Sequence, residues 1–215
     1  MKTKIFSIKR ALNFGYDTFK QNYKILLLVV VFMALVNSVP SYVSDQLKNT
    51  ELPFIIVVFF FLFSIMFSAL SVIISMGMIR ISLRLFNSKK VVFVDLFHDL
   101  NRFFDYLFGI ILYGLIIAGG LILFIIPGII WMIRFQYFGY FLIDKNKGPI
   151  ESLKLSYQAS KGSTLNILIF NIVLLVVNLI GVTFFVVGLL VSIPATMLAN
   201  VYVYNKLQRQ LHSRK

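Results

Sequence analysis

The chain alternates between long uncharged apolar runs and shorter polar segments rich in Lys and Arg. Four runs, at 25–44, 52–79, 106–133 and 162–205, contain no Asp, Glu, Lys or Arg. About 20 apolar residues are enough to cross a bilayer core of roughly 30 Å, so every run is long enough for at least one helical span. The pattern therefore predicts an all-α membrane protein.

Glycine and proline divide these runs into six predicted transmembrane helices. Pro127 and Gly128 interrupt the third run, and the 44-residue run that starts at Gly162 is too long for one crossing at a rise of about 1.5 Å per residue. The latter run divides most naturally near Gly181. The predicted spans cover about 25–43, 53–79, 106–126, 129–143, 164–180 and 183–205.

Each odd-numbered span follows a segment whose apolar residues recur every three or four positions, which is typical of an amphipathic helix. These segments cover about 5–23, 91–105 and 149–161. Two of them, ALNFGYDTFK and SLKLSYQASK, share Leu, Tyr and Lys at matching places. We therefore expect the chain to consist of three units, each an interfacial helix followed by a membrane hairpin. The segments either lie in the headgroup layer, with Lys and Arg toward anionic lipid, or pack on one another as a cytoplasmic cap.

Composition and charge agree with this layout. Of the 215 residues 59% are apolar, and the mean hydropathy is +0.89, which is more apolar surface than a soluble domain of this size can bury. The net charge is +13, and with six spans all 21 Lys and Arg residues except Lys48 and Arg134 fall on one side. The positive-inside rule then places both termini in the cytoplasm, and we expect a bacterial cytoplasmic membrane protein.

Small side chains predict where the spans pack together. Ser64, Ser68, Ser71 and Ser75 form a continuous stripe on the second span. Hydrophobic burial drives helices together only weakly in lipid, so close approach at small residues matters more there. We expect this stripe to pack against another helix, with a polar pore lining as the alternative.

Polar residues within the spans are the candidate binding residues. Asn171 and Asn178 lie seven residues apart on the fifth span, and buried amides need partners in a medium without water. They either bridge helices or line a substrate path. Arg134, inside the fourth span, is either an anchor or a contact for an anionic ligand or lipid headgroup. As an anchor it would reach the outer interface, the carbonyls freed at Pro127, or the two asparagines.

The sequence contains no recognisable catalytic set. There is no cysteine, and His98 stands among Asp95, Asp99 and Arg102, where a solvated helix face is favoured over a metal site. Walker, nucleophile-elbow and HExxH motifs are absent from the sequence. The basic C-terminal residues lack stacking or groove-reading neighbours, which argues against nucleic acid. We therefore expect neither enzymatic activity, nor a cofactor, nor a metal.

A resemblance strengthens the architectural prediction. PGIIWMIRF, then Asp144, then ESLKLSYQASKG resemble a bacterial family of six-helix membrane proteins of unknown function. That family includes the YciC-like inner-membrane proteins and the membrane domain fused to some glycerophosphodiester phosphodiesterases. The aromatic residue common after the family's glycine is replaced here by Ser163 and Thr164, and the resemblance implies a fold but not the phosphodiesterase activity. The matching motif positions are Pro127, Gly128, Arg134, Asp144, Ser152, Leu153, Lys154, Ser156 and Gly162.

Three functions fit this sequence. The favoured one is a non-catalytic inner-membrane component that organises lipid or partner proteins, with anionic headgroups, a membrane protein or a second copy of the chain as partner. The first alternative is a small permease or transporter subunit with an anion site near Arg134, because broken helices at membrane depth are typical of transporters. The second alternative is an immunity or export accessory that protects the cell's own membrane.

Overall fold

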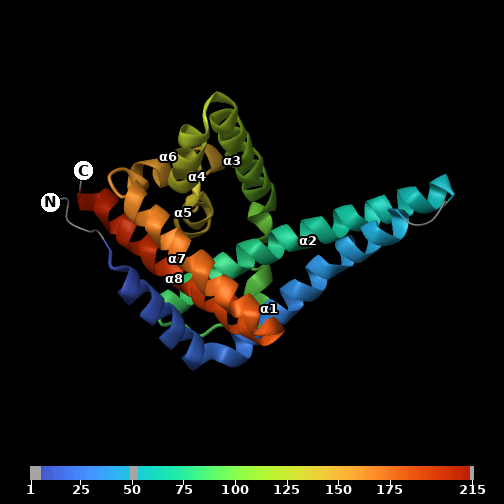
Figure 1. The fold of residues 1–215 in the computed structure, drawn as a ribbon, viewed down its shortest axis with the longest axis horizontal. Coiled ribbons are helices and arrows are strands. Elements are labelled where there is room, and N and C mark those ends of the chain that lie inside the picture. Colours follow the sequence, from blue (N-terminus) through green and yellow to red (C-terminus); the bar gives the residue numbers. More distant parts are fainter. Residues whose placement is uncertain (1–5, 49–52, 214–215) are drawn as a thin grey trace.

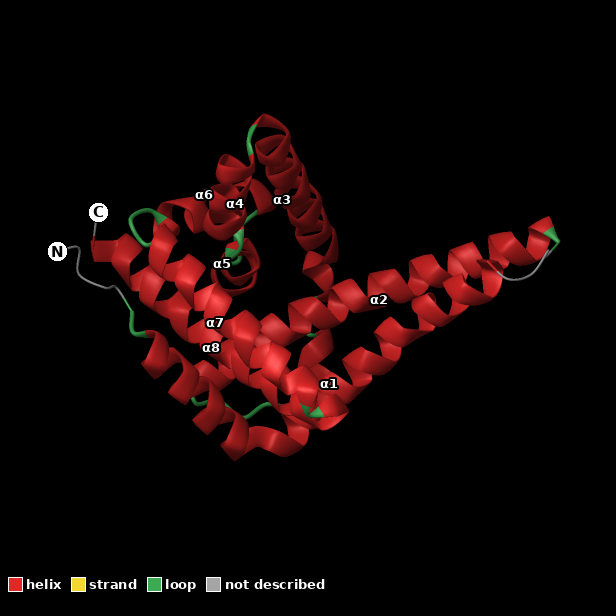
Figure 2. Ribbon diagram, in the orientation of Figure 1, coloured by secondary structure: helices red, strands yellow, loops and turns green. Residues whose placement is uncertain are grey.

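The computed structural model describes residues 6–48 and 53–213, and these residues are almost entirely helical (Figures 1 and 2). No strand occurs in these two ranges, so the all-α prediction is confirmed there. The helices are α1 (Ile8–Lys48), α2 (Phe54–Phe86), η1 (Phe93–Phe97), η2 (Leu100–Arg102), α3 (Phe103–Leu123), α4 (Ile125–Phe135), α5 (Phe138–Lys145), α6 (Pro149–Ser160), α7 (Thr164–Thr183) and α8 (Phe185–Ser213), with η marking 3-10 helices.

Neighbouring helices form three hairpins, α1–α2, α3–α4 and α7–α8, and the short helices α5 and α6 lie between the second and third hairpins in the chain. The outer part of the α1–α2 hairpin projects away from the other helices (Figure 1). In the described residues, six stretches are long and apolar enough to cross a membrane, which indicates a multi-pass membrane protein. They are Ile8–Val43, Phe54–Phe86, Phe93–Leu123, Ile125–Lys145, Thr164–Thr183 and Val187–Leu211.

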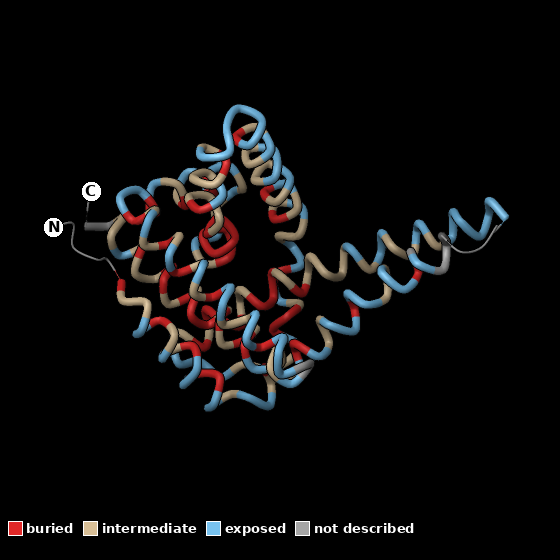
Figure 3. The backbone as a smooth tube through the Cα atoms, viewed as in Figure 1, coloured by how far each residue is buried: buried red, intermediate tan, exposed pale blue. Residues whose placement is uncertain are grey.

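The buried residues lie where the helices pack together, and the projecting part of the α1–α2 hairpin is mostly exposed. Buried positions gather around α5 and where α2 passes α8, while exposed positions run along the outer part of the α1–α2 hairpin (Figure 3). The side chains of Phe54 and Ile122, near two hairpin ends, are 82% and 85% exposed. Large apolar side chains at such exposure suit contact with lipid tails rather than water.

The first predicted amphipathic segment and the first predicted span form one 41-residue helix, α1, with a kink at Asn22. The Asn22 backbone leaves the helical region (φ −123°, ψ 22°), and its side-chain amide donates to the Thr18 carbonyl at 3.0 Å. Asparagine competes in this way with the helical hydrogen bonds and bends the helix. The leg before the kink packs on α8, where a Cβ on Gly15 would lie 2.3 Å from the Ala195 carbonyl oxygen. Ile5, the first residue of the predicted segment, lies outside the described residues.

The second predicted amphipathic segment, 91–105, is not one α-helix. It forms η1 and η2 before α3 begins. Asp95 and Asp99 are only 6% and 7% exposed, so the interpretation of this region as a solvated helix face is wrong for both carboxylates. Ion pairs hold them against α2, which overrides the local helical periodicity.

The turn between the second hairpin's helices lies earlier than the sequence suggested. The helical conformation is interrupted at Phe124, whose backbone is extended (φ −162°, ψ 148°). The next helix, α4, begins before Pro127 and includes it. Pro127 therefore stands in the first turn of α4, where a missing N–H costs no intrahelical hydrogen bond. Gly120 and Gly128 let the two helices approach closely, since a Cβ on Gly120 would lie 2.8 Å from the Gly128 Cα.

Candidate functional site

Arg134 lies in the last turn of α4, half-buried against α6 and the start of α7. Its Nε donates to the Thr164 hydroxyl at 3.1 Å, and its Nη1 donates to the Tyr157 hydroxyl at 2.9 Å. The guanidinium carbon also lies 4.9 Å from the centre of the Tyr157 ring, within cation–π range.

These partners correct the pairing expected from the sequence. Arg134 contacts neither the carbonyls near Pro127 nor the amides of Asn171 and Asn178, and it points toward α6 rather than toward the Phe124 turn. The contacts tie α4, α6 and α7 together. Recognition of an anionic ligand by Arg134 stays a prediction.

Ser156 explains how the fourth span tolerates a break. Between α4 and α5 the helical hydrogen bonding is interrupted at Gln136 and Tyr137. The fully buried Ser156 hydroxyl donates to the Arg134 carbonyl at 2.8 Å and accepts from the Tyr137 N–H at 3.1 Å. Backbone groups freed in an apolar interior need such partners. One hydroxyl on α6 therefore satisfies both sides of the break.

The other motif residues have separate places. Ser152 is buried on the same face of α6 as Ser156, and its hydroxyl lies 3.4 Å from the Lys147 carbonyl oxygen. Lys154 lies on the exposed face of α6. Gly162 has a φ of 84°, a left-handed conformation that strains any residue with a Cβ, and it turns the chain from α6 into α7.

The two asparagines of α7 do not act together. The Asn171 amide donates to the Gln136 side-chain oxygen at 2.9 Å, which links α7 to the α4–α5 break. Asn178 lies further along α7, and its buried side-chain oxygen has no hydrogen-bond partner within the described ranges. Asn171 thus bridges helices, one of its two predicted roles.

The serine stripe of α2 bonds mainly within its own helix. Ser68 donates to the Ser64 carbonyl at 2.8 Å, and Ser75 donates to the Ser71 carbonyl at 2.9 Å. The Ser71 hydroxyl donates to the Asn37 side-chain oxygen of α1 at 3.0 Å. This contact lies between the two helices of the first hairpin.

The sequence analysis did not predict a cluster of ion pairs between α2 and the 93–102 region. Arg80 of α2 donates through Nε to Asp99 at 2.7 Å, and Arg84 Nη1 lies 2.6 Å from Asp95. The arginines and the aspartates are each four residues apart, and this matched spacing was readable in the sequence. The cluster fastens η1 and η2 to α2.

A second polar contact joins α5 and α8. The Tyr204 hydroxyl donates to Asp144 at 2.8 Å, and Lys145 Nζ lies 3.0 Å from the same carboxylate. The rings of Tyr140 and Tyr204 stack with centres 5.1 Å apart. Residues 6–48 and 53–213 offer no group of three or more His, Asp or Glu side chains suited to a metal.

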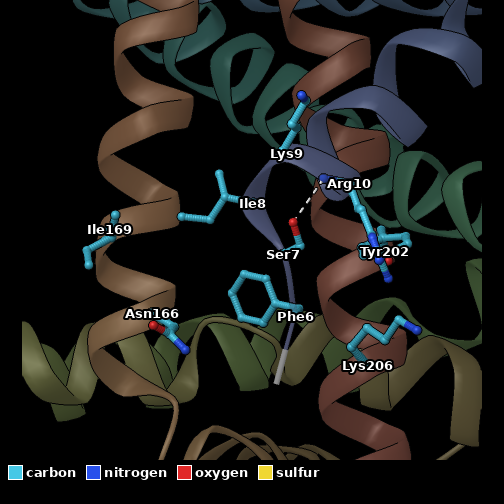
Figure 4. Close-up of a pocket in the computed structure, with 9 residues that line it drawn as sticks. All are labelled: Phe6, Ser7, Ile8, Lys9, Arg10, Asn166, Ile169, Tyr202 and Lys206. Carbon is cyan, nitrogen blue, oxygen red and sulfur yellow. Dashed lines mark hydrogen bonds between the residues drawn. The ribbon is translucent and has the colours of Figure 1, made fainter. Parts of the chain in front are cut away.

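A hollow of about 510 Å³, the basic hollow, opens where the start of α1 meets α7 and α8 (Figure 4). Lys9 and Arg10 of α1 are exposed there, and Lys206 of α8 is half-buried, with its Nζ 5.5 Å from the centre of the Tyr202 ring. Asn166 of α7 adds an amide. Three cationic groups and an amide suit the binding of a phosphate-bearing anion.

The comparisons with known proteins leave the function open. No family model and no solved structure matches the chain. An uncharacterized protein of Mycobacterium bovis and one of Mycobacterium tuberculosis are similar, each 28% identical over 131 residues. The matched region covers 61% of this chain and 40% of each relative, so it spans less than half of the relatives' length.

Proposed function

We propose that the protein is a non-catalytic component of the bacterial cytoplasmic membrane that organises anionic lipid at its cytoplasmic face. Both termini lie in the cytoplasm in this proposal. The observation that carries it is the basic hollow, which is lined by Lys9 and Arg10 of α1 and, from the other end of the chain, by Lys206 of α8. A cluster of cations beside apolar, lipid-facing helices attracts anionic headgroups.

The basic residues divide into those that form ion pairs within the protein and those that are exposed, and this difference supports the proposal. Arg80, Arg84 and Arg102 form ion pairs with aspartates, so their charges stabilise the fold. By contrast, Lys20, Lys24, Lys89 and Lys90 are exposed at the α1 kink and beyond the end of α2. These lysines lie on the side that the positive-inside rule assigns to the cytoplasm, where they add attraction for anionic lipid.

The contacts of Arg134 favour an anchor over a transport site. The guanidinium is occupied by the hydroxyls of Tyr157 and Thr164 and by the Tyr157 ring. We infer that its charge holds the broken fourth span in place. The permease and immunity-accessory hypotheses gain no comparable contact in the part of the chain that the structure describes.

Lipid composition around the protein tests the proposal. The protein is extracted with its surrounding lipid into polymer-bounded nanodiscs, and the ratio of anionic to zwitterionic lipid is compared with that of the bulk membrane. We expect at least about a twofold enrichment of anionic lipid, since each basic residue near the surface contributes about 1 kcal/mol of attraction. Replacing the four exposed lysines Lys20, Lys24, Lys89 and Lys90 with glutamine should remove at least half of this enrichment.

The matched control is Lys48→Gln, which changes one charge on the predicted opposite side and should leave the ratio unchanged. A wild-type protein whose discs have the lipid composition of the bulk membrane would contradict the proposal. An equal effect of Lys48→Gln and of the four-lysine variant would also contradict it.

A further inference from the structure

Two hollows lie along the same three helices, and their linings differ in chemistry. The basic hollow is one of them. The second, the apolar hollow, also has a volume of about 510 Å³ and is lined by Leu12 and Tyr16 of α1, Val177 and Ile180 of α7, and the first half of α8, including Val191. Both therefore open between the first leg of α1 and the α7–α8 hairpin.

Residue spacing places the two hollows on one face of each helix. On α7, the basic hollow is lined by Asn166 and Ile169. The apolar hollow is lined by Val177 and Ile180, which follow these two residues by eleven positions each. Eleven residues make just over three turns of a helix, so these side chains share a face. On α1, Ile8, Leu12 and Tyr16 follow at intervals of four residues.

The distance between the hollows matches the length of one lipid tail. Eleven residues of α7 separate corresponding positions, which is about 16 Å at a rise of about 1.5 Å per residue. Half of a hydrocarbon core of roughly 30 Å is about 15 Å. A ligand with its charge in the basic hollow and its tail in the apolar hollow has the length of a single lipid.

We propose that these hollows bind one anionic glycerophospholipid. Its phosphate lies by Arg10 and Lys206 (Figure 4), and an acyl chain covers Leu12, Val177 and Ile180. A free phosphate would use only the basic end and leave the apolar hollow empty, whereas an acyl chain occupies it with the gain that hydrocarbon burial brings. This deepens the proposed function and rests on it, because it takes anionic lipid as the ligand and assigns it a defined place.

Binding of defined lipids to the purified full chain in detergent tests this assignment. Native mass spectrometry follows titrations with phosphatidylglycerol and phosphatidylcholine of equal chain length. We expect one phosphatidylglycerol per chain, bound about tenfold more tightly than phosphatidylcholine. The double variant Arg10→Gln and Lys206→Gln should bind phosphatidylglycerol about tenfold more weakly, because two headgroup contacts lose their charge.

A matched control removes two charges from the same helices outside the hollow. Lys20→Gln with Arg209→Gln changes two exposed residues of α1 and α8, and binding should stay within about twofold of wild type. Ile180→Trp tests the apolar end. Ile180 is 54% exposed, so the larger ring is tolerated by the fold, and it should weaken binding of both lipids by filling the hollow.

Two results would overturn the assignment. The first is equal weakening by the two charge-removing pairs, which would mean attraction to the surface as a whole. The second is full displacement of phosphatidylglycerol by inorganic phosphate together with no effect of Ile180→Trp, which would mean a site for a free anion. If binding to the hollows fails while the nanodiscs still enrich anionic lipid, only this assignment falls. If enrichment fails as well, the proposed function falls with it.

Discussion

Replacing Gly77 with alanine is expected to prevent the protein from accumulating in a folded form. A Cβ on Gly77 would lie 2.3 Å from the Leu96 carbonyl oxygen and 2.4 Å from the Leu96 Cα. Both are backbone atoms, which cannot rotate away as the end of a flexible side chain can. Ion pairs at Asp95 and Asp99 hold this backbone on α2, so the clash can be relieved only by pulling η1 off the helix.

The expected loss is at least about 3 kcal/mol of unfolding free energy, at the upper end of overpacking costs. Size-exclusion chromatography of a fluorescent fusion, with a thermal unfolding curve of any recovered protein, measures it. Gly114→Ala on α3 is the matched control, because nothing lies within 4 Å of its Cβ position. Alanine has the higher helix propensity, so the control should be neutral or more stable by up to about 1 kcal/mol. Equal yields and melting temperatures for the two variants would refute the close approach of α2 and η1.

Asp99→Asn is the second change expected to have a large effect. Asp99 and Arg80 form a pair in which the side chains are 8% and 27% exposed, so neutralising the carboxylate leaves a partly buried guanidinium without its counterion. Breaking a buried pair from one side costs about 3–5 kcal/mol, and the partial exposure of Arg80 lowers our expectation to about 2–3 kcal/mol. Thermal unfolding in detergent measures the loss.

Two further variants show whether the loss comes from the unpaired charge. Asp105→Asn removes a carboxylate that is 47% exposed and lies 3.2 Å from Arg102, and it should cost less than about 1 kcal/mol. Arg80→Met combined with Asp99→Leu should recover part of the loss, because an apolar pair leaves no buried charge. If Asp99→Asn costs no more than Asp105→Asn, the ion pair does not hold the 93–102 region on α2.

The long helices and α6, expected at 149–161, were predictable, and the segments at 5–23 and 91–105 were not. Run length indicated helices at 25–43 and 53–79, and run length together with the division near Gly181 indicated one at 164–180, because few other structures satisfy an apolar backbone in lipid. Amphipathic periodicity near 5–23 could not distinguish a separate interfacial helix from the first leg of a bent α1. At 91–105 the same periodicity failed, since contacts with α2 that are remote in sequence decide the local conformation.

The candidate site shows a similar limit. A charge within an apolar run singled out Arg134 from the sequence, because such residues are costly unless they have partners. Its partners Tyr157 and Thr164 lie 23 and 30 residues further along the chain, and only the folded arrangement of α6 and α7 identifies them. Ser156 stood out by resemblance to a family motif, while its role at the α4–α5 break depends on three-dimensional contacts.

In the proposed arrangement the chain crosses the membrane six times, with its basic clusters on the cytoplasmic side. The sequence contains no cysteine, so single-cysteine variants can be labelled without background. Lys48→Cys and Lys147→Cys are compared in intact cells and after permeabilisation, with a maleimide that does not cross membranes. We expect position 48 to react in intact cells and position 147 to react only after permeabilisation. Labelling of both positions from the same side would contradict the six-span arrangement and the lipid-binding proposals that depend on it.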